Sequence, residues 1–166
     1  MIFVTVGTER FPFDRLVSAV DGLKDVFQGE SIYMQIGSGT YIPSCPYERF
    51  ITYGEFCNKI REARIVISHA GAGTLLMCSE YGKIPIMMPR KQCFAEHVDD
   101  HQRMLADRMV ERGRIILADN SEDLKDRILQ YDQLCLAGKN LYSEGSAMVQ
   151  HLRILLKGID RNIITP

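Results

Sequence analysis

Short apolar runs alternate with amphipathic segments along this chain, and this alternation restricts the fold more than any other feature. Each run is four to six residues long and almost unbroken, which is typical of strands buried on both faces of a sheet. Between the runs, apolar residues recur every three or four positions, as at Phe13, Leu16 and Val20, which indicates helices. The pattern predicts the α/β class, with a single Rossmann-like, doubly wound parallel sheet. The expected strands are 1–6, 32–36, 50–53, 64–68, 84–88 and 114–117, and the expected helices are 12–27, 55–63, 74–81, 97–112, 121–135 and one within 138–166.

Composition excludes several classes of protein. The chain has 166 residues, enough for one domain with a sizeable core, and its formal net charge of -1 argues against a nucleic-acid partner. Its five cysteines are scattered without a Cys-x-x-Cys pair, which argues against a disulfide framework and a zinc site. We find no signal-peptide pattern and no apolar run of about 18 residues. These observations predict a cytoplasmic protein with a main domain at 1–136 and a helical tail at 137–166.

The segment Ser68-His69-Ala70-Gly71-Ala72-Gly73-Thr74 links an apolar run to a predicted helix that opens at Gly73-Thr74. Small residues let a ligand approach the backbone, and the first N–H groups of a helix lack partners and lie at its positive end. The segment is therefore a candidate site for an anion such as a diphosphate. Two more small-residue loops, Gly7-Thr8 and Gly37-Ser38-Gly39, follow strands that would end at the same sheet edge.

A tight turn is the simpler interpretation of each of these glycine pairs. The first loop lacks the Gly-x-Gly-x-x-Gly pattern of dinucleotide-binding proteins, and the chain lacks the Gly-Lys-Ser/Thr of P-loops. Among nucleotide sites, a mononucleotide or nucleotide-sugar site remains. Glu80 follows Gly73 by seven residues, so the two would share one helix face, about 10 Å apart. Glu80 could then bind ribose hydroxyls, or it could be a solvated surface residue.

Residues 89–102 would lie at the same edge and concentrate polar side chains there. They include two basic residues, two histidines and three carboxylates, which suit sugar hydroxyls and phosphate groups. A metal site is the alternative, because His97 and His101 lie four residues apart on a predicted helix. However, no glutamate directly follows the first histidine, and no third ligand can be named.

Four motifs taken together, Ser68–Thr74, Glu80, Pro89-Arg90 and Glu96–Gln102, resemble the C-terminal half of glycosyltransferase family 28, which includes the MurG-type lipid-intermediate transferases. The chain is most similar to the short stand-alone members. These are the soluble catalytic subunit of the two-part GlcNAc transferase acting on dolichol-diphosphate-GlcNAc, and its bacterial relatives in exopolysaccharide and capsule assembly. The resemblance covers residues 1 to about 135, including the segments Val4–Thr8, Phe13–Val17 and Met34–Gly37.

The resemblance implies the donor-binding half of a GT-B fold, which binds a UDP-sugar and needs no cofactor or bound metal. The diphosphate would lie on Ala70–Thr74 and the ribose at Glu80. Arg90 is the candidate cation for stabilising the departing diphosphate. His69 is the second candidate catalytic residue, with a positioning role as its alternative. The residues implied to bind the UDP-sugar are Gly7, Thr8, Gly37, Ser68, His69, Ala70, Gly71, Ala72, Gly73, Thr74, Glu80, Pro89, Arg90, Glu96, His97, Asp99 and Gln102.

The length of the chain implies a partner if the resemblance holds. A complete GT-B enzyme has two such domains with the acceptor between them, and this chain has room for one. We therefore expect a membrane-anchored, acceptor-binding subunit that recruits the chain to the cytoplasmic face of a membrane and to a lipid-linked sugar acceptor. The general base would lie on either subunit, and the tail helix would dock on the partner or fold back on its own sheet. A UDP-GlcNAc 2-epimerase or hydrolase and a non-catalytic nucleotide-sugar-binding protein remain as alternatives.

Overall fold

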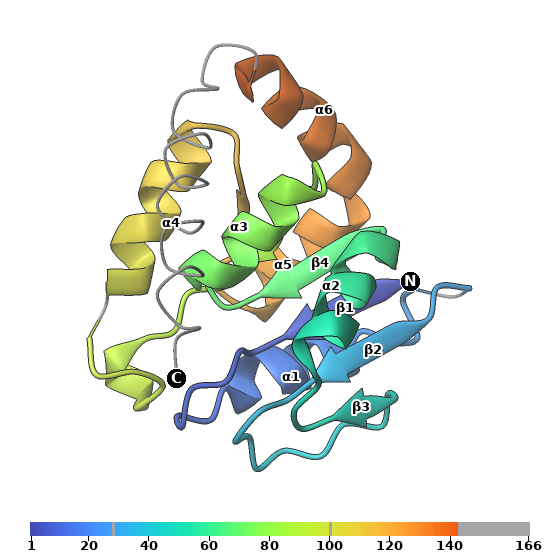
Figure 1. Ribbon diagram of the computed structural model, residues 1–166, viewed down its shortest axis with the longest axis vertical. Coiled ribbons are helices and arrows are strands. Elements are labelled where there is room, and N and C mark those ends of the chain that lie inside the picture. The colour runs from blue at the N-terminus through green and yellow to red at the C-terminus, as the bar shows by residue number, and fades with distance from the viewer. Residues whose placement is uncertain (28, 100, 143–166) are drawn as a thin grey trace, which may run out of the picture.

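A six-stranded parallel sheet lies at the centre of the computed structural model, which describes residues 1–27, 29–99 and 101–142 (Figure 1). The strands are β1 (Ile2–Thr5), β2 (Ile32–Gln35), β3 (Tyr47–Glu48), β4 (Ile65–Ser68), β5 (Ile86–Met87) and β6 (Ile116–Leu117). Their order is β3-β2-β1-β4-β5-β6, so the direction of winding reverses between β1 and β4. All five strand pairs are parallel. This topology confirms the predicted doubly wound, Rossmann-like class.

Helices cover both faces of the sheet. They are α1 (Asp14–Asp21), α2 (Tyr53–Glu62), α3 (Ala72–Glu80), α4 (His101–Glu111), α5 (Ser121–Leu129) and α6 (Tyr131–Tyr142), with a short 3-10 helix, η1, at Gln92–Phe94. Alternate side chains of a strand point to opposite faces, so β1 contributes to both layers. Ile2 and Val4 belong to a cluster with residues of α1, α5 and α6, whereas Phe3 packs with residues of α2 and α3.

The expected strand at 50–53 is wrong, because a capping box places the start of a helix there. Thr52 is the N-cap of α2, and its hydroxyl accepts a hydrogen bond from the Glu55 backbone N–H at 3.3 Å. In return, the Glu55 carboxylate accepts one from the Thr52 N–H at 2.8 Å. The edge strand lies earlier, at Tyr47–Glu48, where both residues are exposed. No alternation of buried and exposed positions therefore marks it in the sequence.

Helix α1 ends at Asp21 and is shorter than the expected 12–27. The buried Asp21 carboxylate accepts hydrogen bonds from the backbone N–H groups of Ser44 and Cys45 and from the Tyr41 hydroxyl. Burial alone would raise the pKa of Asp21, but these hydrogen bonds outweigh it and hold the pKa well below its ordinary value. The end of α1 thereby anchors the long loop that precedes β3.

Two other helix boundaries differ from expectation. Helix α4 begins at His101, and His97 lies in the preceding loop, so the two histidines do not share a helix. The expected helix 121–135 is interrupted at Gln130, which separates α5 from α6. Helix α6 runs across the expected boundary between 136 and 137, and the tail at 143–166 lies outside the described residues. Within the described part, no helix is long and apolar enough to span a bilayer.

Candidate functional site

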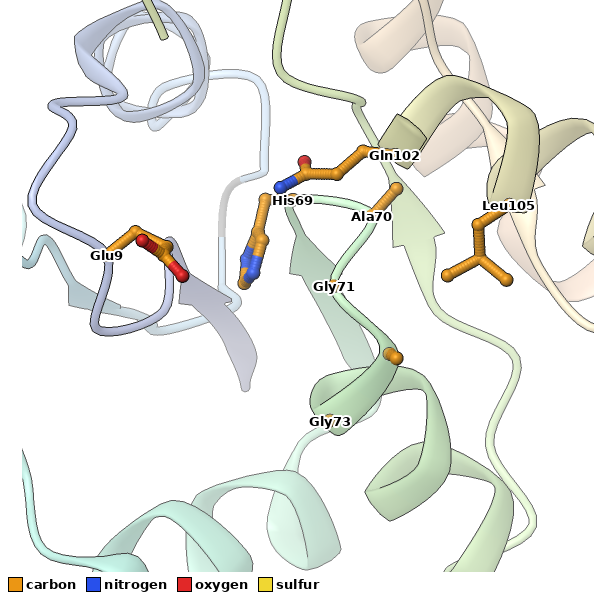
Figure 2. A pocket seen from close by; sticks show the side chains of 8 residues that line it. Glu9, His69, Ala70, Gly71, Gly73, Gln102 and Leu105 are labelled. Carbon is orange, nitrogen blue, oxygen red and sulfur yellow. The ribbon is translucent and has the colours of Figure 1, made fainter. Parts of the chain in front are cut away.

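A cavity of about 470 Å³ opens at the carboxyl edge of the sheet, beyond the ends of β1 and β4 (Figure 2). Ligands bind at this place in doubly wound sheets, because the reversal of winding leaves a crevice there. The loop after β1, the turn between β4 and α3, and helix α4 all contribute to it. Its lining residues are Glu9, His69, Ala70, Gly71, Ala72, Gly73, Gln102 and Leu105.

Six of these lining residues were expected at the site, and two were missed. Glu9 directly follows the Gly7-Thr8 loop, and this adjacency was the available signal for it. Leu105 lies three residues after Gln102 on α4, so both residues occupy one helix face. The expected residues Ser68 and Thr74 flank the turn and are buried.

The N-terminus of α3 is the part of the cavity best suited to an anion. Gly71 is the N-cap residue and, as a glycine, has no side chain that could cap the first turn. Ala72 and Gly73, the first two helical residues, are exposed. A Cβ atom at Gly73 would meet no atom within 4 Å, so the backbone there is open to a ligand. Unpaired amides and the positive end of the helix dipole together favour a phosphate group.

His69 lies on the buried side of the cavity, with 8% of its surface exposed. Its Nδ1 atom is 3.2 Å from Oγ of Ser68, within hydrogen-bond distance. Burial lowers the pKa of His69 to about 4, and the nearby charge of Arg90 acts in the same direction. The imidazole is therefore neutral at pH 7.

The buried Gln35 side chain, at the end of β2, holds the turn that begins at Gly7. Its Oε1 accepts hydrogen bonds from the Thr5 hydroxyl at 2.6 Å and the Gly7 N–H at 3.2 Å, and its Nε2 donates to the Gly7 carbonyl at 2.9 Å. Gly7 has a φ of 77°, and a Cβ atom at Gly37 would lie 3.0 Å from the Gly7 carbonyl oxygen. Gly7 and Gly37 thus shape the first loop, beside the exposed Thr8, and none of these three residues lines the cavity.

Arg90 was expected to face the diphosphate as a cation, but the structure places it elsewhere. Its side chain is fully buried and lies over the Phe13 ring, 4.8 Å from the ring centroid. Burial lowers the pKa of the guanidinium. The group joins the β1–α1 loop to the loop after β5, and it does not line the cavity. It donates hydrogen bonds to the backbone carbonyls of Val6, Phe11, Pro12 and Glu96.

Glu96 is likewise held within the protein. Its carboxylate accepts two hydrogen bonds from the Arg15 guanidinium, both at 2.8 Å, and one from the Lys91 backbone N–H at 2.9 Å. Arg15 also donates to the Pro89 carbonyl at 2.9 Å. Glu96 and Pro89 were expected to contact the ligand, but their polar groups fix the loop after β5 to α1.

The remaining expected residues are divided between the cavity and its surroundings. Gln102 lines the cavity, and its Oε1 accepts a hydrogen bond from the Arg90 backbone N–H at 3.3 Å. His97 and Asp99 pair with each other in the loop before α4, with Nδ1 and Oδ1 3.1 Å apart. Glu80 is exposed at the last residue of α3. Among the residues described, no three His, Cys, Asp or Glu side chains are grouped so that they could hold a metal ion.

Known proteins share both the sequence and the fold of this chain. Residues 1–144 match the glycosyltransferase family 28 C-terminal domain. The UDP-N-acetylglucosamine transferase subunit ALG13 of Homo sapiens is 31% identical over 125 residues, which cover 69% of this chain and 10% of ALG13. The chain therefore spans only a small part of the length of this relative.

Solved structures extend the likeness at the level of the fold. MurG of Acinetobacter baumannii superposes with a TM-score of 0.60 at 17% identity, covering 93% of this chain and 49% of MurG. The UDP-GlcNAc 2-epimerase of Neisseria meningitidis, bound to UDP-GlcNAc, superposes with a TM-score of 0.61 at 10% identity, covering 97% of this chain and 44% of the epimerase. The match over residues 1–144 confirms the resemblance found in the motifs. This chain belongs to the glycosyltransferase family 28 C-terminal domain family.

Proposed function

We propose that this chain is the donor-binding half of a split glycosyltransferase, which moves a sugar from a UDP-sugar to a lipid-linked saccharide. The observation that carries the proposal is the N-terminus of α3, where the N-cap residue Gly71 has no side chain to cap the helix and Ala72 and Gly73 line the cavity. The family to which the chain belongs supports glycosyl transfer as the reaction. The name of the relative ALG13, a UDP-N-acetylglucosamine transferase subunit, favours UDP-GlcNAc as the donor.

The diphosphate of the donor would bind the first amides of α3. In the reaction, an acceptor hydroxyl oxygen attacks C1 of the donor sugar while the bond from C1 to the diphosphate oxygen breaks. The electron pair of that bond leaves with UDP, the configuration at C1 inverts, and the hydroxyl proton passes to a general base on this chain or its partner. Helix amides and the helix dipole stabilise the charge that develops on the diphosphate, so the proposed reaction needs no metal or cofactor.

Other residues would bind the rest of the donor. Gln102 and Glu9 line the cavity and carry the hydrogen-bonding groups that sugar hydroxyls require. Glu80 is the proposed ribose contact, because it lies seven residues beyond Gly73 on α3, about 10 Å along the helix. We expect Glu80→Ala to weaken UDP binding by about 1–3 kcal/mol, as measured by titration calorimetry. Unchanged affinity would assign Glu80 to the solvated surface instead.

A second subunit would complete the enzyme. This chain covers only 49% of the MurG chain, and the ALG13 relative is itself called a subunit. We infer that the acceptor half is a membrane-anchored protein that brings the chain to the cytoplasmic face of a membrane. The lipid-linked acceptor would then be extended there during exopolysaccharide or capsule biosynthesis.

The test is to incubate the purified chain with labelled UDP-GlcNAc and a lipid-diphosphate-linked sugar, with and without membranes that contain the second subunit. We expect labelled lipid-linked product only when the purified chain and the membranes are both present. Transfer by the purified chain alone would refute the split enzyme. Release of a 2-epimer would show an epimerase, and UDP-GlcNAc binding without turnover in either mixture would show a binding protein.

A further inference from the structure

The two glycines of the turn after β4 have different surroundings. A Cβ atom at Gly73 would meet nothing within 4 Å, whereas one at Gly71 would overlap Nε2 of His69 and lie 2.9 Å from Cδ2 and Cε1 of the same ring. Gly71 has a φ of -83° and a ψ of 134°, which any residue adopts. The backbone conformation therefore does not require glycine at position 71, and the imidazole ring does.

The same ring meets the first loop on its other side. A Cβ atom at Gly7 would lie 2.6 Å from Cε1 and 3.0 Å from Nε2 of His69. The Cε1–Nε2 edge of the ring thus fills the space that a side chain at either glycine would need. Gly7 belongs to the β1–α1 loop and Gly71 caps α3, so the His69 ring lies between these two backbone segments. Figure 2 shows the ring between Glu9 of the same loop and Gly71.

The position of the ring is itself fixed by the sheet. Ser68, whose Oγ lies 3.2 Å from Nδ1 of His69, is the register partner of Thr5 in the central strands β4 and β1. The ring is therefore attached beside the two central strands and projects between the β1–α1 loop and the N-terminus of α3. The Ser68 hydroxyl suits Nδ1 in either neutral form of the imidazole, because a hydroxyl both donates and accepts.

We propose that His69 is a positioning residue, which holds the β1–α1 loop and the N-terminus of α3 at the separation that the diphosphate of a UDP-sugar requires. This role rests on the proposed function, and it differs from that of a general base. A base must exchange a proton with the acceptor, whereas a spacer acts through its volume and its fixed attachment. The two roles predict different responses when the space beside the ring is filled.

The experiment is a double-mutant cycle on Gly71 and His69, with UDP as the probe in titration calorimetry. Gly71→Ala should weaken UDP binding about tenfold in the wild-type background, because the added methyl group pushes against the ring. In the His69→Ala background, the same substitution should change UDP affinity less than about twofold, because the ring is absent. Equal losses in the two backgrounds would overturn the proposal.

A matched control and a second readout keep the two proposals separate. Gly73→Ala adds the same methyl group two residues away into open space, so its thermal midpoint should equal or exceed that of the wild type, whereas Gly71→Ala should lower it. If the wild-type chain does not bind UDP, the proposed function fails. The double-mutant cycle on Gly71 and His69, measured by thermal midpoints, then still tests whether the His69 ring keeps the two backbone segments apart.

Nuclear magnetic resonance on the wild-type chain covers the case in which a variant fails to fold. The spacer role predicts proton–proton contacts from Hε1 of His69 to the α-protons of both Gly7 and Gly71. It also predicts that the Hε1 resonance stays constant between pH 5.5 and 8. Absence of either glycine contact, or a titration near the ordinary histidine pKa of about 6.5, would overturn it.

Discussion

The segments 68–74 and 89–102 both reach the carboxyl edge of the sheet, but they use their polar groups differently. In the first, Ala72 and Gly73 are exposed, and the N-cap residue Gly71 has no side chain to cap the helix that they begin. In the second, the charged groups of Arg90 and Glu96 are buried and hydrogen-bonded within the protein. The charged segment therefore holds the loops around the cavity in place, whereas the small-residue segment presents its backbone to a ligand.

The largest loss of stability is expected when the buried Arg90 side chain is replaced. Arg90→Met leaves four carbonyls without their donors, two of them in fully buried hydrogen bonds, so we expect the free energy of unfolding to fall by about 3–5 kcal/mol in urea titrations. The matched control is Arg10→Met, because Arg10 is exposed, and its effect should stay within about 0.5 kcal/mol. An Arg90→Met protein with wild-type stability but no transferase activity would show that Arg90 is a catalytic cation and not a structural residue.

The second effect is a dependence of the free energy of unfolding on pH, caused by the titration of His69. Between the ordinary pKa of 6.5 and the folded value of about 4, the unfolded chain binds a proton that the folded chain does not. Stability is therefore lost as the pH falls through this window, by up to about 3 kcal/mol. Urea titrations at pH 7 and pH 4.5 should show a larger loss for the wild type than for His69→Gln. Equal losses would mean that the ring is not held in its neutral form.

The third effect concerns the pair of Glu96 and Arg15, which fixes the charged segment to α1. Glu96→Gln keeps the shape but removes the charge, and we expect a loss of about 2 kcal/mol in the free energy of unfolding because the carboxylate is buried. Asp107→Asn breaks an exposed pair with Arg103 and should cost less than about 1 kcal/mol. If the two variants lost equal stability, the buried pair of Glu96 and Arg15 would contribute no more to holding the charged segment on α1 than an exposed pair does.

The fold could be predicted from the sequence because its signals are local. Apolar runs such as Ile65–Ser68 mark buried parallel strands, and the small residues at 70–73 mark the turn that follows. The edge strand Tyr47–Glu48 could not be found, because it is two residues long and exposed. The capping box of Thr52 and Glu55 was readable and would have corrected the strand expected at 50–53.

The site was only partly predictable, because its geometry depends on distant pairs. The partners of Arg90 are backbone carbonyls as far away as Val6, 84 residues earlier, and backbone groups carry no sequence signal. A basic residue at a sheet edge was therefore expected to face a ligand. Gly71 and Gly73 look alike in the sequence, and the structure shows that a side chain at Gly71, but not one at Gly73, would meet the His69 ring.

In the proposed enzyme, the start of α3 binds the diphosphate of the donor. The direct measurement is a nuclear magnetic resonance titration of the ¹⁵N-labelled chain with UDP and, separately, with uridine. We predict that UDP shifts the amide resonances of Ala72 and Gly73 and binds at least about tenfold more tightly than uridine, because the helix amides bind phosphate oxygens. Equal affinity for UDP and uridine, or unshifted Ala72 and Gly73 amides at saturating UDP, would show that the start of α3 does not bind the diphosphate.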